Sequence, residues 1–168
     1  MRHKSTPQAS FFNVGAGISL ALLCAMAMQA HAATITVTNT NDSGPGSLRQ
    51  ALTIANDGDT ITFSVIGTIT LTSGGLLIAK NLTISGPGSN QLSIDGNQAV
   101  LVFGVFPDKT AAISGLSIRN GQDGIWNEGT LTVSDCVVSG NSYEGLLNHY
   151  SLTVSDCVVS GNSGGGLQ

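Results

Sequence analysis

Two pairs of residues that could do chemistry recur at one offset. Asp135 and Asp156 lie 156 − 135 = 21 positions apart, and so do Cys136 and Cys157. If the fold stacks them one strand spacing apart, at about 5 Å, two carboxylates could share a Ca²⁺ ion. Two cysteines at that spacing have a Cα–Cα distance within the range of disulfides. The chemistry therefore depends on the elements that position these residues.

Those elements belong to an internal repeat. Residues 131–142 read LTVSDCVVSGNS, and residues 152–163 repeat them without a change. A period of 20–50 residues indicates a solenoid, a propeller or an array. Leucine and valine alternate with threonine and serine, which is the period of a half-buried strand. A propeller blade needs about 40 residues, and no helical pattern fits the unit. We therefore predict an all-β fold, a right-handed parallel β-helix (β-solenoid).

Stacked coils would place equivalent side chains on one another. Asn141 and Asn162 should then form an amide ladder. Asp135 and Asp156 are either a weak Ca²⁺ site or two solvated corner residues. Cys136 and Cys157 are either a disulfide or two packed thiols, and their spacing from His149 suits zinc poorly.

Other chemistry has little support in the sequence. A Ser-His-Asp set is not credible, because His149 is the one histidine after position 32. We therefore expect no catalytic constellation and no cofactor other than the weak Ca²⁺. The formal net charge of −4 argues against nucleic-acid binding, which needs a basic face. Trp126, Tyr143 and Tyr150 could stack on sugar rings or pack on turns.

The first 32 residues have the pattern of a secretory signal peptide. Basic residues precede an apolar run, ISLALLCAMAM at 18–28, and Ala30-His31-Ala32 provides small residues before a cut at Ala33. Eleven apolar residues are too few to span a bilayer, which takes about 20. The mature chain would have four basic and ten acidic side chains, a net charge of 4 − 10 = −6.

Residues 33–59 are predicted to form an N-terminal cap. Ser47 and Gln50 have the spacing of a capping box. Leu48, Ala51, Leu52 and Ala55 follow at helical spacing, and Asn56-Asp57-Gly58 ends the pattern, which predicts a two-turn helix over the open end of the first coil.

Residues 60–168 are predicted to form about five coils. Short strands are expected at Leu71-Thr72, Leu82-Thr83-Ile84, Leu92-Ser93-Ile94 and Leu116-Ser117-Ile118, with a strand or bulge between Val100 and Phe106. The sequence stops at Gln168, the third residue of a new repeat, so we expect a truncated piece of a longer protein. Its open last rung would favour self-association.

The cap and the coils together resemble a known group. Gly46-Ser47-Leu48-Arg49-Gln50-Ala51 is similar to the CSLREA signature, and Gly58-Asp59-Thr60-Ile61-Thr62-Phe63 follows it as in that group. The coils resemble the family pattern of Gly-Gly-Ala-Ile followed by Phe-x-x-Asn, with Val138 and Val159 in place of phenylalanine. The chain thus resembles bacterial secreted β-helix proteins of the polymorphic outer-membrane protein and CSLREA-domain type.

That resemblance implies a protein that is secreted or displayed at the cell surface or outer membrane. The expected function is an adhesin-like passenger, a structural shaft whose ligand is a glycan or a cell surface. The alternative is a β-helix polysaccharide lyase or glycoside hydrolase that acts on acidic glycans.

Overall fold

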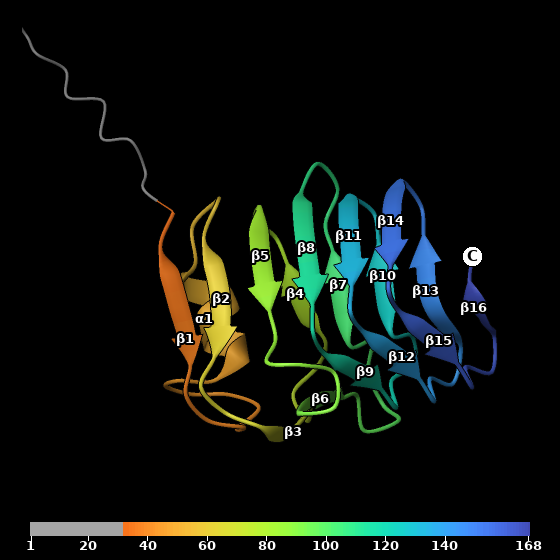
Figure 1. The fold of residues 1–168 in the computed structure, drawn as a ribbon, viewed down its shortest axis with the longest axis horizontal. Coiled ribbons are helices and arrows are strands. Elements are labelled where there is room, and N and C mark those ends of the chain that lie inside the picture. Colours follow the sequence, from red (N-terminus) through yellow and green to blue (C-terminus); the bar gives the residue numbers. More distant parts are fainter. Residues whose placement is uncertain (1–31) are drawn as a thin grey trace, which may run out of the picture. The chain divides into compact units, whose positions relative to one another are not determined.

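The structure of the chain is a computed structural model that describes residues 32–168. The predicted signal peptide therefore lies, except for Ala32, outside the described residues. The described part is almost entirely β-structure, arranged in three parallel sheets (Figure 1).

Each sheet contains strands from successive turns of the chain. Sheet I consists of β1 (Thr34–Val37), β2 (Thr60–Phe63), β5 (Leu82–Ser85), β8 (Thr110–Ser114), β11 (Thr130–Ser134) and β14 (Ser151–Ser155). Sheet II consists of β3 (Gly67–Thr70), β6 (Leu92–Asp95), β9 (Ser117–Arg119), β12 (Val137–Ser139) and β15 (Val158–Ser160). Sheet III consists of β4 (Leu76–Ile78), β7 (Phe103–Val105), β10 (Ile125–Asn127), β13 (Glu144–Asn148) and β16 (Gly165–Leu167).

The strand register stacks equivalent residues in columns. Leu131 pairs with Leu152, and Val133 pairs with Val154. Every strand pair in the three sheets is parallel, and each coil adds one strand to each sheet. The predicted parallel β-solenoid is therefore confirmed.

The core runs through the inside of the coils. In β11, Leu131 and Val133 are buried whereas Thr132 is exposed, as the alternating pattern predicts. One column of sheet I contains Ile61, Ile84, Ile113 and Val133, and all four are at most 1% exposed. Burying each such side chain stabilises the fold by about 1.5–3 kcal/mol, so the columns hold the coils together.

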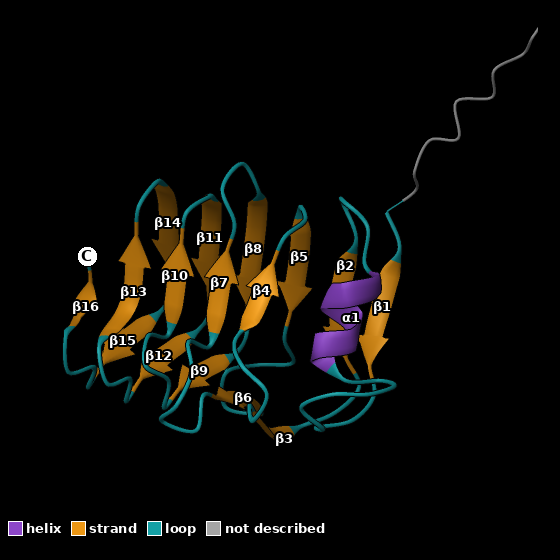
Figure 2. Ribbon diagram, turned by 180° about the vertical axis from the view of Figure 1, so that it is seen from behind, coloured by secondary structure: helices purple, strands orange, loops and turns teal. Residues whose placement is uncertain are grey.

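The short predicted helix is also present, as α1 (Leu48–Ile54). It packs on β1 and β4, beside the strands of sheet III (Figure 2), and buries Leu48 and Ala51. The Ser47 side chain accepts a hydrogen bond from the Gln50 amide at 3.2 Å, as in a capping box. The Gln50 side chain accepts from the Gly46 amide instead of the Ser47 amide. No helix in residues 32–168 has the length and apolar character required to cross a membrane.

Three details differ from the sequence predictions. The strand expected at Leu116-Ser117-Ile118 is β9, which begins at Ser117. The helix ends at Ile54 rather than at Asn56. The strand expected at Leu71-Thr72 is instead β3, which ends at Thr70. Leu71 is buried at the corner that follows, and the Thr72 amide leaves the sheet to bond a side chain of the cap. Leucine burial at a corner thus imitates the sequence pattern of a strand.

Candidate functional site

The two aspartates occupy equivalent corners, after β11 and β14. Both are exposed, and each has φ of 53°. Gly115 occupies the same corner after β8, with φ of 64°. Asp, Asn and Gly are the residues that adopt this left-handed conformation most readily, so Asp135 and Asp156 fit a turn role. In residues 32–168 no group of three or more His, Cys, Asp and Glu side chains gathers as a metal site would require. Calcium binding by the pair stays a prediction.

The two cysteines are free thiols that stack in register. Cys136 is buried and Cys157 is half-buried. The Cys136 amide donates a hydrogen bond to the Cys157 sulfur at 3.4 Å. Burial raises the pKa of the Cys136 thiol to about 11, which keeps it protonated and poorly nucleophilic. His149 lies elsewhere, with its ring centroid 5.4 Å from that of Trp126.

Asn141 and Asn162 form a hydrogen-bonded ladder inside the corner. The Asn141 side-chain amide donates to the Asn162 side-chain oxygen at 2.8 Å. The Asn141 oxygen accepts from the Gly121 amide of the preceding coil at 2.8 Å. Asn141 is fully buried, and these bonds satisfy both ends of its side chain.

A second ladder was not predicted. Asn127 donates to the Asn148 side-chain oxygen at 2.7 Å and to the Ser151 carbonyl at 2.9 Å. The signal was present in the sequence, because these asparagines are also 148 − 127 = 21 positions apart. Both ladders specify the register of the coils.

A carboxylate fastens the cap to the first full coil. Asp42 accepts hydrogen bonds from Arg49 Nη2 at 2.6 Å, from the Ser73 amide at 2.9 Å and from Thr72 Oγ1 at 3.0 Å. Burial alone would raise the pKa of Asp42, but hydrogen bonds from Ser73, Arg49 and Thr72 outweigh it and hold the pKa far below its usual range. We call this arrangement the Asp42 clasp. No sequence pattern predicts it, because Thr72 and Ser73 lie 30 and 31 residues away from Asp42 in a coil that does not repeat.

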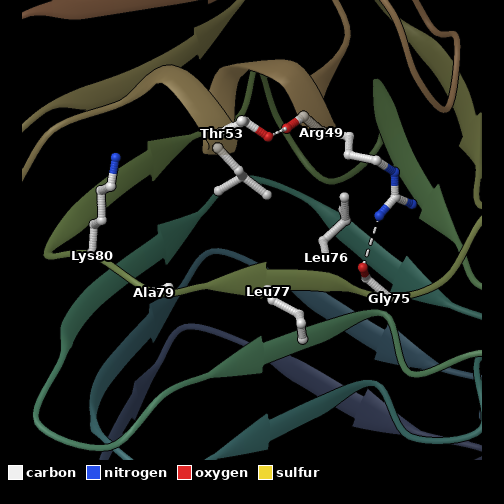
Figure 3. Close-up of a pocket in the computed structure, with 8 residues that line it drawn as sticks. Arg49, Thr53, Gly75, Leu76, Leu77, Ala79 and Lys80 are labelled. Carbon is white, nitrogen blue, oxygen red and sulfur yellow. Dashed lines mark hydrogen bonds between the residues drawn. The ribbon is translucent and has the colours of Figure 1, made fainter.

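A groove of about 320 Å³ lies between α1 and β4. Figure 3 shows Arg49 at one end and Lys80 at the other. Arg49 donates to the carbonyls of Gly74 and Gly75, and Lys80 donates to the Ala55 carbonyl. Both cations therefore already hold α1 and its C-cap residue, Ala55, against the coil.

A second hollow, of about 260 Å³, lies farther along sheet III. Leu77 separates the two, because it lines both. The second hollow is lined by Leu77, Leu101, Gly104, Val105, Phe106, Trp126 and Glu128. Unlike the groove at α1, it combines two aromatic rings with a carboxylate.

Comparison with the models of known protein families gives no match. Comparison with curated proteins gives none either. The fold therefore rests on the structure, and the family resemblance rests on the sequence motifs alone.

Proposed function

We propose that this chain is a structural shaft segment of a secreted or surface-displayed β-helix protein, of the polymorphic outer-membrane protein and CSLREA type. The observation that carries the proposal is the uniform stack of coils on one apolar core. Six strands of sheet I cover five intervals, or about 24 Å along the axis at about 4.8 Å each. A stack of this kind lengthens by one strand spacing for every repeat added, which suits a spacer.

The outer face of sheet I supports this role. Ladder neighbours there are mostly hydroxyl residues, such as Thr132 with Thr153 and Ser134 with Ser155. A face without charged side chains has no evident catalytic group. In the described residues, no observation favours the alternative of a lyase or hydrolase on acidic glycans.

Deleting one repeat tests the shaft directly. Removal of residues 132–152, a full period of 21, joins Leu131 to Thr153 and recreates the repeat sequence. The shorter protein should keep its circular dichroism spectrum and its export, and small-angle scattering should show a length reduced by about 5 Å. Removal of residues 132–151 is the matched control, because the extra leucine shifts the strand by one residue and turns its apolar face outward. Loss of folding in the 21-residue deletion, or tolerance of both deletions, would contradict the proposal.

Export and catalysis need tests of their own. A C-terminally tagged full chain should appear outside the cytoplasm with Ala33 at its N-terminus, and Leu22→Arg in the apolar run should retain it inside. Replacing Asp135, Asp156 and His149 by alanine should leave display unchanged. Formation of a Ca²⁺-dependent, ultraviolet-absorbing product from uronate polymers would favour the lyase instead.

A further inference from the structure

The hollow on sheet III lies at a column in which one strand lacks a side chain. Leu77, Gly104 and Trp126 are ladder neighbours in β4, β7 and β10. The backbone of β7 is therefore the floor of the hollow, and the side chains of Leu77 and Trp126 rise on either side of it. A Cβ atom at Gly104 would lie 3.0 Å from Leu77 Cδ2 and 3.2 Å from Leu101 Cδ2. A larger residue at this position would push these two leucine side chains out into the hollow.

The walls of the hollow leave large apolar surfaces in contact with water. Trp126 is 37% exposed, Phe106 is 41% exposed and Leu77 is 52% exposed. The His149 ring lies close to the Trp126 indole ring. His149 belongs to the coil that follows that of Trp126, whereas Gly104 belongs to the coil that precedes it. Such exposure of neighbouring large side chains is typical of a binding site.

The size and polarity of the hollow restrict the ligand. At about 260 Å³ it is smaller than the pockets of about 300–1,000 Å³ that enclose a drug-sized molecule, so it suits a single ring. A pyranose ring has an apolar C–H face that can stack on an indole and a rim of hydroxyl groups that donate hydrogen bonds. Glu128 provides an acceptor at the edge, and its negative charge disfavours uronates and other anionic sugars.

We propose that the hollow over Gly104 binds one pyranose ring of a neutral glycan, stacked on Trp126 and hydrogen-bonded through its hydroxyl groups to Glu128. This site goes beyond the shaft role and does not depend on it. An aromatic ring beside a carboxylate also attracts quaternary ammonium groups. Here Leu77 and Leu101 line the space around Gly104, so the hollow is not an aromatic cage, and the sugar fits it better.

The sequence contains one tryptophan, so its fluorescence reports directly on this site. The full chain should be titrated with neutral pentasaccharides of glucose, xylose, mannose and N-acetylglucosamine, with oligogalacturonate and with choline chloride. At least one neutral pentasaccharide should give a saturable change and bind at least tenfold more tightly than oligogalacturonate and choline. Failure of all four neutral sugars to saturate at millimolar concentration, or tighter binding of choline, would overturn the proposal.

Two variants locate the binding, measured by calorimetry so that loss of the indole does not remove the signal. Gly104→Val fills the hollow, and the atoms that it meets are the ends of flexible leucine side chains. Trp126→Ala removes one wall. Each should weaken binding of the sugar at least tenfold, whereas Tyr150→Ala, the loss of a 74% exposed aromatic ring outside the hollow, should not. Wild-type affinity in a folded Gly104→Val protein, or equal loss in Tyr150→Ala, would refute the site.

Discussion

Replacing Asp42 by asparagine should loosen the cap from the first full coil. The Asp42 side chain is 10% exposed and accepts from Arg49, Thr72 and Ser73. A hydrogen bond to a charged group contributes about 1.5–3 kcal/mol and a neutral one about 0.5–1.5 kcal/mol. Asparagine also turns an amide NH₂ group toward one of these donors. We therefore expect the free energy of unfolding to fall by about 2–4 kcal/mol. Breaking a fully buried ion pair costs somewhat more, about 3–5 kcal/mol.

The loss should be greatest at the N-terminal end of the solenoid. Coils interact mainly with their neighbours, so a defect in the first coil need not reach the last. Hydrogen exchange should therefore accelerate in β1 and α1 of the Asp42→Asn variant, and much less in β12 and β15. If the protein unfolds in one step, the unfolding midpoint should fall by about 8–16 °C, at about 4 °C per kcal/mol.

The effect should depend on pH in one direction. Because the pKa of Asp42 is lowered in the folded state, its stabilisation is complete above the unfolded pKa of about 3.9 and is lost as the pH falls below that value. The difference between wild type and Asp42→Asn should thus be largest near pH 7 and shrink below about pH 4. Asp108→Asn makes the same change at an exposed turn, so it should alter neither the stability of the protein nor its dependence on pH. Equal destabilisation by both variants, or a difference unchanged down to pH 3, would refute the clasp.

Three further predictions concern buried polar groups. Asn141→Ala should lower the free energy of unfolding, measured with denaturant, by about 1–3 kcal/mol, because it leaves the buried Gly121 amide without an acceptor. A decrease of less than about 0.5 kcal/mol, the lower end for one hydrogen bond, would contradict this. At pH 8 a thiol reagent should modify Cys157 well before Cys136, whose pKa is raised by burial. Mass spectrometry of the digested protein measures both, and earlier modification of Cys136 would contradict its burial. The Ala33 nitrogen donates to Asp59 at 2.7 Å. In a chain that starts at Ala33 this nitrogen is a charged amino terminus, and its hydrogen bond to the carboxylate is stronger. That chain should therefore melt at a higher temperature than one extended by two residues, and Asp59→Asn should abolish the difference.

The fold could be predicted from the sequence because the coils repeat. Twelve identical residues at one offset fix the strand period, the stacking register and the left-handed corners together. The cap helix was predicted from local chemistry, since Ser47 and Gln50 lie three positions apart. The Asp42 clasp could not be predicted, because it joins two non-repeating loops whose proximity depends on the finished fold.

The same regularity explains why the repeat itself says little about function. A residue that recurs in the two identical repeats, such as Asn141 or Asp135, has the same structural role in both: a ladder bond or a corner conformation. A ligand site needs a local departure from that regularity. On the outer face of sheet III, Gly104 lacks a side chain between Leu77 and Trp126, and a hollow lies at this interruption. In a chain of this kind, the outward positions where a column breaks are therefore better candidates for binding than the residues that repeat.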